Sequence, residues 1–167
     1  MQTIWITGGS SGIGFATAKE FLKNNWQVII SSSNQEKLNN AKARLNEINK
    51  KNLLHTIKCD ISIKKEVDET VAYIEKYIGK IDIALLNASA YSPNEDQKFN
   101  ISNYELLIDV NIKGTLYCIN ILKDFMKFRD NTIAIISSPL GYRGWPTAGA
   151  YGISKAAQLS LSETLFF

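Results

Sequence analysis

The sequence predicts an α/β fold in which five parallel strands form a doubly wound sheet with helices on both faces. Short apolar, β-branched runs alternate with longer segments of helical periodicity, which is typical of strand–helix–strand units with right-handed crossovers. The runs are apolar at consecutive positions, as in Ile133-Ala134-Ile135-Ile136, so helices should cover both faces of each strand. The length of 167 residues, 45% of them hydrophobic, fits one domain spanning 1–167.

The expected elements follow in order along the chain. The strands are expected at residues 3–7, 27–31, 53–58, 82–86 and 132–137, and the helices near residues 12–24, 35–50, 64–78, 102–129 and 148–167. In the fourth helix, Ser102 and Glu105 form a capping-box pattern at the expected start. An apolar stripe follows along it, made of Tyr104, Leu107, Ile108, Ile112, Leu116 and Ile119.

Charge and composition exclude several classes of function. The formal net charge is only +3 and the lysines are dispersed, so neither nucleic acid nor an anionic membrane is an expected partner. Cys59, Cys118 and the single His55 lack metal-ligand spacing, so we expect no metal site and a reducing, cytoplasmic setting. The first residues enter a strand directly, without a signal-peptide pattern, and no apolar run reaches membrane-spanning length.

A glycine-rich turn joins the first strand to the first helix, with the sequence Thr7-Gly8-Gly9-Ser10-Ser11-Gly12-Ile13-Gly14. Glycines let backbone N–H groups approach a pyrophosphate, whose charge then lies at the positive end of the helix. The turn is not a Walker loop, because Lys19 lies too far along the helix. It predicts a nucleotide site in a Rossmann-like fold, although such a turn also occurs as a simple tight connection.

Tyr151 and Lys155 are four residues apart and would share one face of a helix. A positive charge ~5 Å from a phenol, at an effective dielectric of ~20, lowers the phenol pKa by roughly two units. Ser138 ends the fifth expected strand, where open α/β sheets place their ligands. Asn111 lies on the apolar stripe, where a buried amide needs partners. Each signal alone has a structural explanation: an exposed pair, a cap or a satisfied core Asn.

In this order and spacing, these motifs resemble the short-chain dehydrogenase/reductase family from Thr3 to the last residue. The resemblance also rests on Asp60 after the third strand, Asn87-Ala88 after the fourth, and Ser137-Ser138-x-x-Gly141. It implies an NAD(P)-dependent oxidoreductase that moves a hydride between nicotinamide and a carbonyl or alcohol carbon. The implied partners are a small-molecule substrate and further copies of the chain, as a homodimer or tetramer.

The resemblance also implies roles for individual residues. Tyr151 would be the catalytic acid/base, Lys155 would lower its pKa and hold the nicotinamide ribose, Ser138 would bind the substrate oxygen, and Asn111 would support a water-mediated proton relay. The residues implied to bind the cofactor are Thr7, Gly8, Ser10, Ser11, Gly12, Ile13, Gly14, Ser32, Ser33, Asp60, Ile61, Asn87, Ala88, Tyr151 and Lys155. Residues 31–34 contain neither an acid for a ribose hydroxyl nor an arginine for a 2′-phosphate, which favours NADP(H) slightly over NAD(H).

The chain departs from the family pattern at two places. Ser89 stands where the family has a glycine beside the cofactor, a change that we expect the fold to tolerate. The chain also ends at Phe167, before the last strands and the substrate lid, so we expect an incomplete C-terminus and an uncovered fifth strand. A non-catalytic nucleotide-binding module, or an epimerase or dehydratase on the same fold, therefore remains an alternative. Residues 91–93 and 142–147 should form the walls of the substrate pocket.

Overall fold

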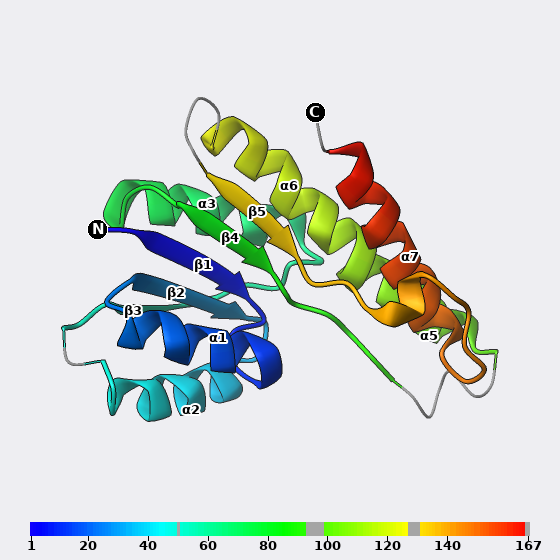
Figure 1. Cartoon of the computed structure of the whole chain (residues 1–167), viewed down its shortest axis with the longest axis horizontal. Helices are drawn as coiled ribbons and strands as arrows, with labels where there is room; N and C mark the ends of the chain where they lie inside the picture. The colour runs from blue at the N-terminus through cyan, green and yellow to red at the C-terminus, as the bar shows by residue number, and fades with distance from the viewer. Residues whose placement is uncertain (50, 93–98, 127–130, 166–167) are drawn as a thin grey trace.

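The computed structural model describes residues 1–49, 51–92, 99–126 and 131–165, and within them five parallel strands form one sheet (Figure 1). The strands are β1 (Thr3–Thr7), β2 (Gln27–Ser32), β3 (Leu54–Lys58), β4 (Ile83–Leu86) and β5 (Thr132–Ile135). Their order is β3-β2-β1-β4-β5, so the direction of winding reverses between β1 and β4. The predicted doubly wound parallel sheet is confirmed, and a ligand crevice is expected at the carboxyl ends of β1 and β4.

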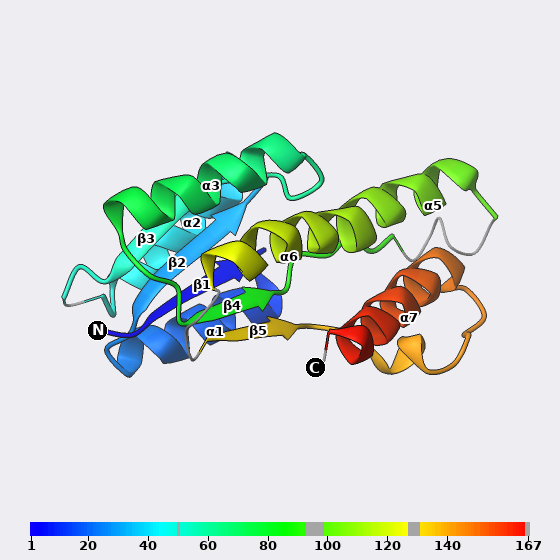
Figure 2. The ribbon, with the colours of Figure 1, turned by 90° about the horizontal axis from the view of Figure 1, so that it is seen from above.

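Helices cover both faces of this sheet (Figures 1 and 2). Helices α1 (Gly12–Lys23) and α2 (Gln35–Asn46) lie on one face, and α3 (Lys64–Tyr77) and α6 (Gly114–Phe125) lie on the other. The alternation of side chains along β1 explains both layers. Ile4 and Ile6 pack in the cluster with α1 and α2, while Trp5 between them packs in the cluster with α3 and α6. Each strand therefore reads as continuously apolar because each face has its own core.

The fourth expected helix is three consecutive pieces. Helix α5 (Ile101–Leu107) continues into a π-helical turn, η1 (Ile108–Lys113), and then into α6, so that the three form one long rod in Figure 2. The expected capping box is wrong: Asn100 is the N-cap, and its side chain accepts from the Ser102 N–H. Asn is as good a cap as Ser, and it stands one residue before the helix. The expected end at Arg129 lies outside the described residues.

The apolar stripe of this rod is only partly buried. Leu107 and Ile119 are buried, whereas Ile108 and Leu116 are exposed. Hydrogen bonds in a π turn skip one more residue than in an α-helix, so the turn η1 rotates the later positions relative to the earlier ones. The sequence periodicity assumed 3.6 residues per turn throughout, so it did not predict this turn.

Helix α7 (Gly149–Thr164) lies beyond the carboxyl end of β5 and packs against α5 and η1 (Figure 1). The short 3₁₀ turn η2 (Pro139–Gly141) connects it to β5. The expected helix began one residue earlier, and its last two residues lie outside the described chain. Strand β5 is the edge of the sheet, as predicted, with only β4 as its neighbour among the described strands.

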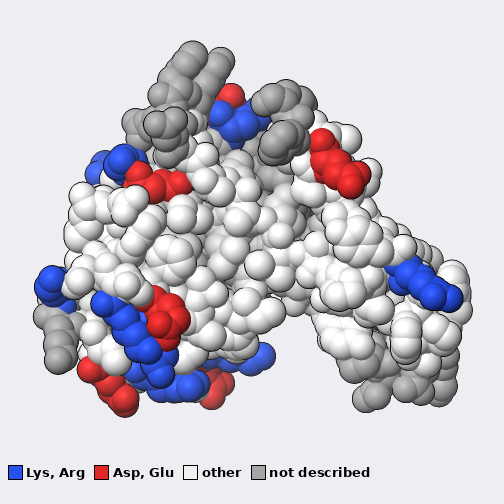
Figure 3. Space-filling model, in the orientation of Figure 1, with Lys and Arg blue, Asp and Glu red and all other residues white. Residues whose placement is uncertain are grey.

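The described residues hold no group of three or more His, Cys, Asp or Glu side chains that could bind a metal ion. Cys59 and Cys118 are buried free thiols. Among the described helices, none combines the length and apolar character needed to cross a membrane. Blue and red side chains are interspersed over the α1–α2 side of the molecule (Figure 3), in keeping with the small net charge.

Candidate active site

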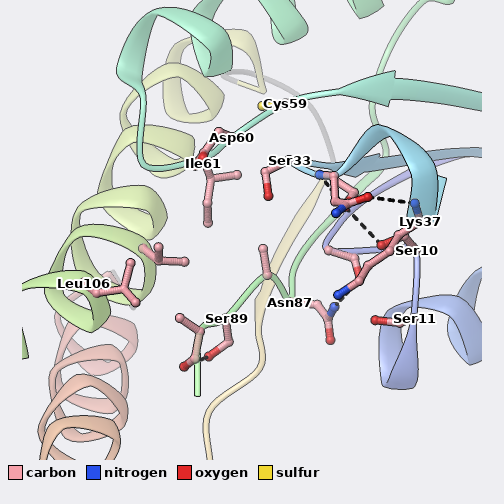
Figure 4. Close-up of a pocket in the computed structure, with 16 residues that line it drawn as sticks. Ser10, Ser11, Ser33, Lys37, Cys59, Asp60, Ile61, Asn87, Ser89 and Leu106 are labelled. Atoms are coloured by element: carbon pink, nitrogen blue, oxygen red, sulfur yellow. Dashed lines mark hydrogen bonds between the residues drawn. The ribbon is translucent and has the colours of Figure 1, made fainter. Parts of the chain in front are cut away.

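A cavity of about 430 Å³ lies at the carboxyl ends of the strands (Figure 4). Figure 3 shows a notch in the outline between the α1–α2 side and the part formed by α5 and α7. In Figure 4, Ser10, Ser33 and Lys37 form a polar wall on one side, and Ile61 and Leu106 form an apolar wall on the other. The full lining is Gly8, Ser10, Ser11, Ser32, Ser33, Asn34, Lys37, Cys59, Asp60, Ile61, Asn87, Ala88, Ser89, Ala90, Leu106 and Val110.

The glycine turn is fixed to the end of β4 by a set of hydrogen bonds. The Thr7 hydroxyl accepts from the backbone N–H groups of Asn87 and Ala88, both at 3.0 Å. The Asn87 amide donates to the carbonyls of Thr7 at 3.0 Å and Gly8 at 3.2 Å. Thr7 is fully buried, so in this structure it supports the turn from behind and does not line the cavity.

Gly8, Gly9 and Gly14 have no room for a Cβ, and Gly8 and Gly12 have positive φ. A Cβ on Gly8 would lie 2.7 Å from Ala88 Cα, and one on Gly14 would lie 2.6 Å from the Gly8 carbonyl oxygen. Gly12 begins α1 with φ +54° and has open space around it. Ser11, the N-cap residue, makes no side-chain cap hydrogen bond, which leaves first-turn N–H groups for an anion. Gly12, Gly14 and the exposed Ile13 do not line the cavity themselves.

The polar wall after β2 contains a cation that the sequence prediction missed. Ser32 and Ser33 line the cavity, as expected, together with Asn34 and Lys37. Asn34 caps α2 by accepting from the Lys37 N–H at 2.9 Å, and this first turn brings Lys37 back to the wall. A lysine three residues after a helix-capping Asn is the signal that was available in the sequence.

The end of β3 supplies Asp60 and Ile61, both in the lining as expected. The Asp60 carboxylate accepts from the Ser62 N–H at 3.0 Å and from the Ser62 hydroxyl at 2.7 Å. Its orientation is therefore set within its own turn. Ser89, the departure after β4, is exposed at the cavity and is not among the residues with positive φ, so its backbone needs no glycine.

Asn111 is fully buried in the π turn η1, where its side chain joins two other segments. Its amide oxygen accepts from the Ala90 N–H at 2.7 Å, and its amide nitrogen donates to the Ala90 carbonyl at 3.0 Å and to the Ser154 hydroxyl at 2.9 Å. Ser154 in turn donates to the Tyr151 carbonyl at 2.8 Å. The buried amide thus holds the segment after β4 against α7.

Tyr151 and Ser138 are in contact at the N-terminal end of α7. The Ser138 side chain, which also accepts from the Leu140 N–H at 3.3 Å, hydrogen-bonds the Tyr151 side chain and lowers its pKa. Burial has the larger effect, and with the nearby Tyr91 it raises the pKa of Tyr151 above its ordinary value. The rings of Tyr91 and Tyr151 are in contact, with centroids 4.6 Å apart. The expected lowering of this pKa by Lys155 stays a prediction.

Lys155 is buried beside Tyr151 and makes polar contacts of its own. Its ammonium lies over the Tyr151 ring, 5.4 Å from the centroid, and donates to the Ile136 carbonyl and to Gln158 Oε1, both at 2.9 Å. Only 1% of the residue is exposed, and burial lowers its pKa to about 8. Helical spacing brought the two side chains together as predicted, but it did not reveal these two acceptors.

Two aromatic residues of the loop after β5 lie away from Tyr151. Tyr142 and Trp145 are exposed and line a separate hollow of about 280 Å³ with Ile153 of α7. Ile153 is two residues from Tyr151, so it faces about 200° away around the helix. The expectation that residues 142–147 form walls of the same pocket is therefore wrong for these aromatic side chains. Tyr91 does adjoin Tyr151, while Pro93 lies outside the described residues.

A family model described as short chain dehydrogenase matches residues 2–167. The chain belongs to the short-chain dehydrogenase family. An uncharacterized oxidoreductase of Staphylococcus saprophyticus is 31% identical over 161 residues, which are 96% of this chain and 68% of the relative. An uncharacterized oxidoreductase of Staphylococcus epidermidis is 29% identical over the same shares.

Solved structures agree with this membership. A short chain dehydrogenase from Bacillus anthracis superimposes with a TM-score of 0.88 at 27% identity, covering 98% of this chain and 66% of that one. NAD⁺-bound xylitol dehydrogenase gives 0.87 at 26% identity, covering 98% and 63%. Levodione reductase gives a TM-score of 0.89 at 23% identity, which supports the fold. The present chain spans 64% of the length of levodione reductase.

Proposed function

We propose that this chain carries the cofactor-binding and catalytic residues of an NAD(P)-dependent oxidoreductase that interconverts a carbonyl and an alcohol. The observation that carries the proposal is the position of the Tyr151 phenol. It is hydrogen-bonded to Ser138, lies under the Lys155 ammonium and contacts Tyr91, which follows the cavity-lining Ala90. Ser138, Tyr151 and Lys155 do not line the cavity themselves, but Tyr91 links Tyr151 to the segment that does, and the polar and apolar walls of the cavity suit a dinucleotide.

The cavity fits the cofactor on structural grounds. The turn residues Gly8, Ser10 and Ser11 would hold the pyrophosphate at the start of α1, and Asp60 and Ile61 would hold the adenine. When bound, the nicotinamide would supply or accept the hydride. The ribose would be held by Tyr151 and Lys155, as the family resemblance implies.

The chain's own residues would handle the proton. The raised pKa of Tyr151 keeps the phenol protonated near neutral pH, so it can donate its proton to the oxygen of a carbonyl undergoing reduction. The Ser138 hydroxyl would hydrogen-bond the same oxygen and stabilise its developing negative charge. In the reverse direction Tyr151 must be a phenolate, and a nearby ammonium and a cationic nicotinamide would both lower its pKa toward that state.

We further propose a preference for NADP(H) over NAD(H), supported by Lys37 in the cavity wall beside Ser32 and Ser33. Lysine is a common phosphate ligand, and two serine hydroxyls can donate to a 2′-phosphate. With no carboxylate at residues 31–34, the wall carries no acid there to repel that phosphate.

Fluorescence titration with NADPH and NADH tests the cofactor assignment. Lys37→Ala should weaken NADPH binding about fivefold and leave NADH binding within about twofold, because one partly solvated charge pair contributes about 1 kcal/mol. Lys42→Ala, on the same helix but outside the cavity lining, is the matched control. Equal loss for both cofactors would contradict the preference.

A carbonyl panel with NADPH tests the reaction. Tyr151→Phe should lower turnover by about 10²-fold or more and cofactor affinity by only about fivefold, because the phenol is the proton donor but only one of several groups that would hold the cofactor. Cofactor binding without turnover in either protein would favour the non-catalytic module, and unchanged turnover in Tyr151→Phe would refute the role of the phenol.

We also propose that the chain pairs with a second copy through α6 and α7, and that it acts in the cytoplasm. Ile112 of η1, Leu116 of α6 and Leu161 of α7 line an open groove, and Leu116 is 42% exposed. Apolar surface of this kind is buried in homodimers. The free thiols of Cys59 and Cys118 fit a reducing compartment.

A further inference from the structure

Gln158 is a polar residue on the buried face of α7, three positions after Lys155, and only 2% of it is exposed. Its amide oxygen accepts from the Lys155 ammonium at 2.9 Å. Its amide nitrogen donates to the Asn111 carbonyl at 2.8 Å and to the Thr115 hydroxyl at 2.9 Å. One side chain therefore connects two of the four residues to which the family resemblance gives catalytic roles.

The Gln158 amide nitrogen and the Asn111 carbonyl oxygen have no hydrogen-bonding capacity left for a further partner. A primary amide has two N–H donors, and those of Gln158 bond the Asn111 carbonyl and the Thr115 hydroxyl. The Asn111 carbonyl oxygen has two lone pairs and also accepts from the Thr115 hydroxyl at 2.7 Å. In this arrangement a water could bind the Asn111 carbonyl only if Gln158 or Thr115 moved away.

Lys155 depends on few polar neighbours. Burial alone lowers its pKa, with no charged group contributing, and the Tyr151 phenol is the titratable side chain in contact with it. Its two bonded acceptors are the Ile136 carbonyl and Gln158 Oε1. Because an ammonium has three N–H donors, these two bonds leave one donor to point toward Tyr151 or a ribose.

We propose that Gln158 is a positioning residue that fixes the Lys155 ammonium by linking it to the Asn111 carbonyl. The side-chain amide lies between Lys155 and Asn111, the residue to which the family resemblance gives a role in a water-mediated proton relay. Unlike water, an amide holds its N–H donors and its acceptor on different atoms, so it fixes geometry without passing a proton along. Its effect on the reaction rests on the proposed function, but its effect on Lys155 does not.

The test measures Lys155 directly in the chain without cofactor. The ammonium signals of [¹⁵N]lysine-labelled protein are followed by NMR through an alkaline titration, with Lys155→Met used to assign the signal. Gln158→Met keeps the length of the side chain and removes the acceptor, so the pKa of Lys155 should fall by about one unit. Gln158→Glu places a carboxylate at the same site, so this pKa should rise by about one unit or more.

Two further proteins complete the design. Gln35→Met, at an exposed glutamine of α2 that bonds Asn39, controls for the substitution itself and should leave the Lys155 signal unchanged. If Gln158→Met does not fold, Gln158→Glu still tests the proposal, because it should raise the pKa of Lys155 instead of lowering it. A Lys155 pKa that stays at the wild-type value in every folded Gln158 variant would overturn the proposal.

Turnover adds a second reading that separates the two proposals. If wild type is active, Gln158→Met should lower kcat about tenfold with little change in KM, because a one-unit shift in a group next to the acid/base changes its effect about tenfold. A variant that only loses stability, with unchanged kcat and Lys155 pKa, would show a packing role and refute positioning. If wild type is inactive but the NMR shifts occur, the oxidoreductase proposal fails and the role of Gln158 stands.

Discussion

Replacing Gly14 with alanine should damage both the stability of the fold and the cofactor site. The added Cβ would lie 2.6 Å from the Gly8 carbonyl oxygen and 2.6 Å from Asn87 Nδ2. Ordinary contact begins near 3.4 Å, so the start of α1 must move by about 0.8 Å relative to the turn. Asn87 cannot simply rotate away, because its amide nitrogen donates to the carbonyls of Thr7 and Gly8.

The magnitude follows from these contacts. Overpacking a close-packed site costs typically 1–3 kcal/mol, so we expect the free energy of unfolding to fall by about 2 kcal/mol. If the shift also breaks one hydrogen bond of the Asn87 amide, about 1 kcal/mol more is lost. Displacing N–H groups that are aimed at a phosphate should weaken NADPH binding at least about tenfold, which corresponds to about 1.4 kcal/mol.

Gly152→Ala is the matched control, because it makes the same chemical change in another buried helical glycine. A Cβ there would meet the Leu140 carbonyl oxygen at 3.5 Å, which is ordinary contact. Without a clash, replacing glycine in a helix should raise the free energy of unfolding by about 0.5–1 kcal/mol. The two substitutions therefore have opposite expected signs.

Urea unfolding of the three cofactor-free proteins, followed by NADPH titration of each, measures both effects. The steric reasoning fails if Gly14→Ala unfolds at the same urea concentration as wild type. It also fails if Gly14→Ala and Gly152→Ala are destabilised equally, because a general sensitivity of buried glycines would then explain both.

Three further predictions concern other parts of the chain. Thr7→Val should lower the free energy of unfolding by about 2–4 kcal/mol, because two backbone N–H groups after β4 lose their acceptor, whereas Thr7→Ser should cost less than about 1 kcal/mol. Between the lowered pKa of Lys155, about 8, and its ordinary value of 10.5, the unfolded chain binds more protons at this residue than the folded chain. The free energy of unfolding of wild type should therefore rise relative to that of Lys155→Met as pH rises through this range, by roughly 3 kcal/mol at most. A difference between the two proteins that does not change with pH in urea unfolding would contradict this. Leu116→Glu should shift sedimentation toward the monomer while Ile63→Glu, at another exposed apolar residue, should not; a wild type that is already monomeric would refute the pairing.

The strands could be predicted from the sequence because burial on both faces gives uninterrupted apolar runs. β1 was predicted at its observed bounds, and the other four strands differ by one or two residues at an end. The rod α5–η1–α6 could not be predicted in the same way. Its cap is set by Asn100, and its π turn carries Asn111, which bonds Ala90 and Ser154, 21 and 43 residues away in the chain.

The candidate site shows the same division between local and long-range information. Short spacings predicted that Tyr151 and Lys155 share a helix face and that the glycine turn adjoins a cavity. They did not predict Lys37 in the wall, because the turn that brings it back depends on the Asn34 cap. They also did not predict that burial raises the Tyr151 pKa, since a pairwise estimate from Lys155 omits the cost of desolvating the phenolate.

The segment after β4 explains how the two sides of the site are held in register. Asn87 at its start is bonded to the glycine turn, and Ala90 near its end is bonded to Asn111, whose side chain also bonds α7. The segment is short, so a displacement at either end must reach the other. A substitution at Asn87 should therefore disturb Tyr151, which it does not contact, and one at Asn111 should disturb the turn. The same arrangement supports the prediction that the fold tolerates Ser89, because its exposed side chain lies between the two anchors and its φ is not positive.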